Sequence, residues 1–134
     1  MGGGVEASFR RAARFSDGWT AGGLPPEQFA QAAGAVRAAW REAGREGEPR
    51  LTALTYFGLG PTAVRDAEHD LKHYYAWLGD EVASMIAAAA ATDEDTVRAY
   101  ARAFEEAGCD ELTFFPTSTD PRQVDLLADA VGLH

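Results

Sequence analysis

Apolar residues recur at steps of three and four along much of the chain, the spacing that places them on one face of a helix. The clearest run lies within residues 64–78, where the repeating apolar positions are Val64, Ala67, Leu71, Tyr74, Tyr75 and Leu78. The same spacing predicts further helices over residues 5–15, 26–43, 82–91, 93–107 and 121–131. Proline near the start and glycine just after the end mark several of these segments, as is typical of helix termini.

Three short runs lack this period and are rich in β-branched and aromatic residues. They cover residues 19–21 (WTA), 51–59 (LTALTYFGL) and 112–115 (LTFF). The last two contain threonine as their only polar residue, which predicts strands covered on both faces. On this interpretation Phe115→Asp buries an unpaired charge and abolishes folding.

Strands and helices therefore alternate along the chain, a pattern that predicts an α/β fold. We expect one domain over residues 1–134, with three parallel strands joined by right-handed helical crossovers. Such a small sheet has two open edges, which soluble proteins normally cover. The sequence therefore predicts a partner that covers them, either a second copy or another chain.

Composition narrows the class of partner and the compartment. The 134 residues carry a net charge of −9, which argues against nucleic acid or an anionic membrane as partner. The longest apolar stretch without charge, residues 82–92, has about half the length needed to span a bilayer. Cys109 is the only cysteine, so an internal disulfide is excluded and a cytoplasmic location is expected.

Two motifs that suggest reactive chemistry favour ordinary roles instead. His69 and His73 are four residues apart with Asp70 between them, a spacing that zinc proteases use. Both lie two positions from Leu71 on the apolar stripe, so the helical rotation turns them outward, and no metal site is expected. Cys109 precedes a predicted buried strand without a histidine at a recognisable spacing, so it is expected to be a small apolar residue.

Two short segments are candidate ligand sites. Gly3 and Gly4 precede the first helix, where bare backbone and helix amides can approach a phosphate; a flexible chain start is the alternative. Thr117 and Ser118 follow the third strand and precede the last helix. In parallel α/β folds this end of a strand holds the ligand, but hydroxyl side chains here also serve as simple helix caps.

Three segments, in this order, resemble the C-terminal part of the luciferase-like monooxygenases: GGGVEASFRRAARFSDGWTAGG, RLTALTYFGLGP and EEAGCDELTFFPTSTDPRQVDLLADAV. The pairing of AARFSDGW with GCDELTFFP and DPRQVDLLA makes the resemblance fairly specific. It implies a partial TIM-type (β/α)8 barrel of about three βα units plus a leading helix. A complete barrel is roughly twice as long. The three predicted strands would then be strands six, seven and eight.

The resemblance also implies a cofactor, either FMN or the related deazaflavin coenzyme. Gly3 and Gly4 match the glycine turn that helps to hold the cofactor's phosphate in the family, with Thr117 and Ser118 as weaker contacts. The family's usual catalytic histidine belongs to the first half of the barrel, so no catalytic residue is assigned here. The chain would supply part of a flavin-dependent oxidoreductase. The alternative is a non-catalytic half-barrel that self-associates or pairs with a complementary N-terminal half.

Overall fold

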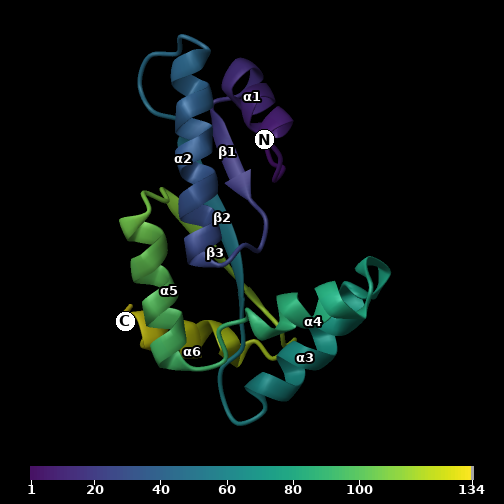
Figure 1. The fold of residues 1–134 in the computed structure, drawn as a ribbon. Coiled ribbons are helices and arrows are strands. Elements are labelled where there is room, and N and C mark those ends of the chain that lie inside the picture. Colours follow the sequence, from purple (N-terminus) through teal and green to yellow (C-terminus); the bar gives the residue numbers. More distant parts are fainter. Residues whose placement is uncertain (134) are drawn as a thin grey trace. The chain divides into compact units, whose positions relative to one another are not determined.

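A computed structural model describes residues 1–133 and confirms the predicted alternation of strands and helices (Figure 1). The elements, in chain order, are α1 (Glu6–Phe15), β1 (Gly18–Ala21), α2 (Pro26–Glu42), β2 (Arg50–Phe57), α3 (Ala63–Tyr74), the 3-10 turn η1 (Ala76–Leu78), α4 (Asp80–Ala88), α5 (Glu94–Glu106), β3 (Glu111–Pro116) and α6 (Arg122–Val131). Within residues 1–133, no helix is long and apolar enough to cross a membrane.

The three strands form one sheet in the order β1-β2-β3. β1 runs parallel to β2, with Gly18 opposite Arg50 and Ala21 opposite Ala53. Between β2 and β3, the N–H of Asp110 bonds the carbonyl of Leu51 at the strand starts, and Thr117 bonds Phe57 at the strand ends. Residue numbers rise together along both strands, so this pair is parallel too, and the predicted α/β class is confirmed.

Contacts divide the chain into two compact units, which are described separately. The first unit comprises residues 1–54 and 102–113, and the second comprises residues 55–101 and 114–133. In the first unit α1 and α2 lie side by side (Figure 1). Its core contains a row of rings in which Trp19 lies 5.5 Å from Phe9 and 6.1 Å from Phe29, and Phe29 lies 5.1 Å from Phe104. The apolar stripes of α1 and α2 thus meet Trp19 of β1, and Phe104 of α5 joins the row through Phe29.

The second unit has two apolar clusters. One gathers the end of β2 with residues of α5, α6 and the segment before α5: Phe57, Leu59, Ala91, Val97 and Ala130. The other lies between α3 and α4 and consists of small residues with one leucine: Ala67, Leu71, Ala87 and Ala90. Alanine on both helices lets their backbones approach closely, which explains why α3 and α4 pack as a hairpin.

The predicted helix stripes extend further than the buried faces do. Val5, Phe15, Val64 and Val124 fit the helical spacing, yet all four side chains are exposed. Val5 precedes α1 and Phe15 is its last residue, while Val64 and Val124 lie in the first turns of α3 and α6. Spacing identifies the face of a helix, but only packing determines how much of its length is covered.

The prediction that both strands are covered on both faces is wrong for β3 and only partly met by β2. Along β2, fully buried residues alternate with partly buried ones, and β3 has no fully buried residue. In β3 the partly buried Leu112 and Phe114 alternate with the exposed Thr113 and Phe115. This two-residue period is that of a strand packed on one face only. Phe115 is 44% exposed, so the interpretation of its ring as a core residue is corrected.

We therefore expect Phe115→Asp to fold, with a change in unfolding free energy within about 1 kcal/mol, because the new carboxylate reaches solvent. The matched variant is Phe114→Asp in the same strand. The Phe114 ring packs edge-on against buried Phe57 at 5.9 Å, so a charge there should destabilise by several kcal/mol. Thermal melts followed by circular dichroism compare the two. Equal losses of stability would show that both faces of β3 are covered.

Candidate functional site

The segment before α1 has a backbone that only glycine fits at one position. Gly3 has φ +122°, and a Cβ there would lie 2.7 Å from the Cβ of Ser8. Its carbonyl accepts a 2.9 Å hydrogen bond from the indole N–H of Trp19, which fixes the segment to the core. Gly4 differs, because a Cβ there would meet nothing within 4 Å. One glycine thus shapes the turn, and the next presents bare backbone to open space.

The first turn of α1 leaves amide groups directed ahead of the helix. Ser8 is buried, and its hydroxyl accepts from the N–H of Val5 and donates to the carbonyl of Val5. The N–H groups at Glu6 and Ala7 lie in the first turn, where no carbonyl of the helix can accept them. Together with the helix dipole they favour an anion. The carboxylate of Glu6 opposes this, but it is paired with Arg10 one turn along α1.

Thr117 and Ser118 follow β3 in the second unit, and neither acts as the predicted helix cap. Thr117 is 4% exposed, and its hydroxyl donates to the carbonyl of Phe57 at 3.2 Å. The hydroxyl of Ser118 accepts from the N–H of Asp120, whose carboxylate accepts from the N–H of Arg122. Two successive turns before α6 are therefore closed by side-chain hydrogen bonds, to Ser118 and then to Asp120. The Thr117 hydroxyl bonds the end of β2 instead.

The predicted residues lie as one pair in each unit. Gly3 and Gly4 lie at the start of α1 in the first unit, and Thr117 and Ser118 lie between β3 and α6 in the second. Of the two pairs, the glycines leave more backbone accessible, because both are exposed and Gly4 has open space beside it. The hydroxyl pair supports the fold around the ends of β2 and β3.

A pair of tyrosines at the end of β2 was not singled out from the sequence. The hydroxyls of Tyr56 and Tyr75 lie 2.6 Å apart, and their rings meet edge to face at 6.2 Å. Burial, and then the hydrogen bond to Tyr75, raises the pKa of Tyr56, so its proton is held firmly. Strand alternation places Tyr56 opposite in direction to buried Phe57, but no spacing in the sequence indicates that Tyr75 meets it.

A second unpredicted feature is a clamp made by Gln123 of α6. Its side-chain oxygen accepts the N–H of Leu59 at 2.9 Å, and its side-chain nitrogen donates to the carbonyl of Leu59 at 2.8 Å. Gln123 is 6% exposed, so both bonds are buried. The clamp fixes the chain just after β2, at the strand end where parallel α/β proteins place their ligand loops.

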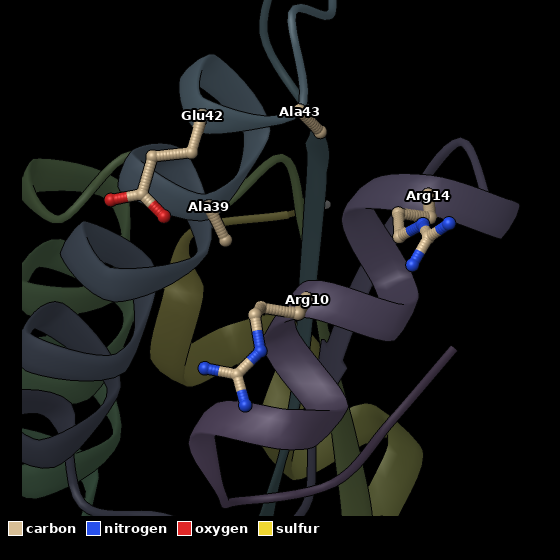
Figure 2. Close-up of a pocket in the computed structure, with 5 residues that line it drawn as sticks. All are labelled: Arg10, Arg14, Ala39, Glu42 and Ala43. Carbon is tan, nitrogen blue, oxygen red and sulfur yellow. The ribbon is translucent and has the colours of Figure 1, made fainter.

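The first unit also contains a cavity between α1 and α2 (Figure 2). Its volume is about 360 Å³, and it is lined by Arg10, Arg14, Ala39, Glu42 and Ala43. In Figure 2 the two arginines come from α1 and the glutamate from α2. A neighbouring cavity of about 210 Å³ shares Arg10, Ala39 and Glu42 with it. The helical spacing predicted which faces of these helices are buried, but it did not indicate this cavity.

The histidines face outward as predicted, and the cysteine lies just before β3. His69 and His73 are exposed on α3, and Cys109 is partly buried with its thiol directed at the carbonyl of Glu111. Burial raises the pKa of the Cys109 thiol, which disfavours the reactive thiolate. Over residues 1–133 no group of three or more histidine, cysteine or acidic side chains is placed to hold a metal ion.

No family model and no curated protein matches this sequence, but solved structures share its fold. An F420-dependent secondary alcohol dehydrogenase with a bound F420-acetone adduct aligns with 97% of this chain at 15% identity and a TM-score of 0.68. An EDTA monooxygenase from Chelativorans sp. BNC1 aligns with 97% at 16% identity and a TM-score of 0.65. The coenzyme F420 dependent tetrahydromethanopterin reductase from Methanopyrus kandleri aligns with 98% at 17% identity and a TM-score of 0.59.

In each of these alignments, this chain covers only part of the solved protein. The covered shares are 47% of the dehydrogenase, 42% of the EDTA monooxygenase and 47% of the reductase. The chain therefore spans about half the length of the structures it matches. The predicted fold is confirmed: a mixed α/β chain with a three-stranded parallel sheet, matching a partial luciferase-like TIM barrel.

Proposed function

We propose that this chain supplies the phosphate-binding part of the cofactor site in a flavin- or deazaflavin-dependent oxidoreductase. The observation that carries the proposal is the start of α1, where Gly3 forms a turn that no side chain fits and Gly4 leaves the backbone open. The likeness in fold to two proteins named for coenzyme F420 supports the class of cofactor. Titration with FMN and with the deazaflavin coenzyme distinguishes the two.

The residues present fit the phosphate end of such a cofactor. Exposed N–H groups and the positive end of the α1 dipole attract an anion, and the lack of a Cβ at Gly4 lets the anion approach the backbone. Arg10 pairs with Glu6 and so reduces its repulsion of a phosphate. FMN and deazaflavin coenzymes both carry phosphate on a chain attached to the ring, and the ring supplies the hydride or oxygen chemistry. This chain's part is to anchor the cofactor's phosphate and so to orient the cofactor.

Thr117 and Ser118 are proposed only as weaker contacts. The hydroxyl of Thr117 already donates to Phe57, and the oxygen of Ser118 already accepts from Asp120. Both hydroxyls therefore have less hydrogen-bonding capacity left for a ligand at this end of β3. The glycines therefore carry the proposal.

The test compares Gly4→Asp with Gly4→Asn, which add side chains of the same size but different charge. Gly4 does not have a positive φ, so both variants should fold. We expect Gly4→Asp to weaken FMN binding, or binding of the deazaflavin coenzyme, about tenfold or more, because a carboxylate then faces the phosphate. Gly4→Asn should weaken it less. Isothermal titration calorimetry measures both affinities.

Riboflavin, which has the ring but no phosphate, is the control ligand. Its affinity should be the same for both variants, because the added charge meets no phosphate. Equal affinities of Gly4→Asp and Gly4→Asn for FMN and for the deazaflavin coenzyme would overturn the proposed site. A wild-type chain that binds neither coenzyme would overturn autonomous cofactor binding as well.

A second candidate function is favoured by the bare face of β3. Phe115 is 44% exposed in a strand at the edge of the sheet, where a soluble chain normally avoids an apolar side chain. We propose as the alternative a non-catalytic half-barrel whose exposed strand is covered by a complementary N-terminal half. After mixing with either coenzyme and separation by size exclusion, a protein peak that elutes colourless favours this alternative. Co-elution of the coloured cofactor with the protein favours the first function.

A further inference from the structure

We propose that the groove between α1 and α2 binds a second copy of this chain, forming a two-fold dimer in which Phe15 of each copy enters the groove of the other. This inference is independent of the proposed cofactor site. It rests on three features of the first unit: the lining of the groove, an exposed ring beside it, and two charges of opposite sign on its rim that form no ion pair with another of residues 1–133.

The groove has an apolar floor and a charged rim. Its two adjoining cavities, of about 360 and 210 Å³, share Ala39 and are also lined by Ala35 and Ala38 of α2 and by Ala43, which directly follows it. These methyl groups leave space that an incoming side chain can fill. Figure 2 shows the side chains of Arg10 and Glu42 on either side of Ala39. An apolar side chain with charged neighbours would match this surface.

Phe15 has these properties and lies next to the groove. It is the last residue of α1 and is 71% exposed. Its ring centre lies 5.5 Å from the guanidinium carbon of Arg14, which lines the cavity. A two-fold dimer requires the projecting group and its receptor on the same patch of surface, because the patch binds to itself. The position of Phe15 beside the cavity meets this requirement.

The charges on the rim can also pair with those of a second copy. Arg14 and Glu42 both line the cavity and are both exposed, and neither forms an ion pair with another of residues 1–133. Arg10, by contrast, is already paired with Glu6. A two-fold axis through the groove can bring Arg14 of one copy to Glu42 of the other, and the symmetry repeats the pair. Such pairs fix orientation more than they add affinity. They favour a second copy over a purely apolar partner.

The test is a charge exchange across the axis. Arg14→Glu and Glu42→Arg should each raise the dimer dissociation constant about tenfold, because each places like charges opposite one another. The double variant Arg14→Glu with Glu42→Arg restores both pairs and should bring the constant back to within about threefold of the wild type. Analytical ultracentrifugation at physiological salt, which screens the net charge of −9 on each copy, measures the constants.

Two further variants complete the design. Phe15→Asp should abolish the dimer at every concentration tested, and because residue 15 is exposed the variant should keep its helix content. Trp77→Ala removes an exposed aromatic residue from the other unit and should leave the dimer unchanged. A wild-type chain still monomeric at about 1 mM would overturn the proposal. So would a dimer that neither Arg14→Glu nor Glu42→Arg alone weakens, one that Phe15→Asp leaves intact, or one that Trp77→Ala dissociates.

Discussion

Gly18→Ala is expected to lose about 3–5 kcal/mol of unfolding free energy, a large part of the stability of a domain of this size. Gly18 begins β1 and lies opposite Arg50 of β2. A Cβ at residue 18 would lie 1.9 Å from the carbonyl oxygen of Arg50 and 2.7 Å from its carbonyl carbon. These are backbone atoms of a paired strand, so no side-chain rotation can relieve the overlap. The two strands must separate at their start.

The loss should extend into the core of the first unit. The residue after Gly18 is Trp19, whose ring is buried against Phe9 and Phe29. If the start of β1 is displaced, the Trp19 ring loses its packing. We therefore expect Gly18→Ala to lose more unfolding free energy than the substitution of an ordinary surface glycine. Urea denaturation followed by tryptophan fluorescence measures the change.

Gly34→Ala is the matched control. Gly34 lies within α2, a Cβ there would meet nothing within 4 Å, and its φ is not positive. Alanine in a helix interior is about 0.5–1 kcal/mol more favourable than glycine, so this variant should be more stable than the wild type. Similar destabilisation by both substitutions would mean that the contact between Gly18 and Arg50 does not determine the stability.

Periodicity predicted the elements well because each pattern has a local physical cause. Helical spacing located every α-helix, and the threonine-rich apolar runs located β2 and β3 to within two residues at each end. Burial was predicted less well, since it depends on what covers a surface. Phe115 shows the difference: its neighbours in sequence indicate a strand, but only the strand order places β3 at an edge.

The sequence indicates a candidate site only where backbone alone defines it, and ligand binding there stays a prediction. A glycine pair before a helix is visible in sequence, and the positive φ of Gly3 is consistent with that prediction. The tyrosine pair and the Gln123 clamp join residues 19 and 64 positions apart, so no local spacing indicates them. Hydrogen-bond partners of this kind follow from the tertiary fold, which the resemblance supplied only in outline.

Gln123→Ala should destabilise the second unit by about 2–5 kcal/mol, because it leaves two buried backbone groups without partners. Both the N–H and the carbonyl of Leu59 bond only to the side chain of Gln123 among the bonds found in residues 1–133. Gln28→Ala is the control, because Gln28 is an exposed residue of α2 and its loss should change stability by less than about 0.5 kcal/mol. Equal effects in urea denaturation would show that the clamp contributes nothing.

Gln123→Glu makes the same clamp depend on pH. A protonated glutamic acid can still donate to the carbonyl of Leu59, whereas the carboxylate places a negative charge against that oxygen in a buried site. Burial thus raises the folded-state pKa above the unfolded value of about 4.3. The stability that the protonated form provides is fully present below the unfolded pKa and is lost as pH rises through the folded pKa. Relative to the wild type, Gln123→Glu should therefore be little affected near pH 4 and clearly destabilised near pH 8, whereas the control Gln28→Glu should show no such trend. A loss of stability in Gln123→Glu that stays constant with pH would contradict a buried hydrogen bond from residue 123 to the carbonyl of Leu59.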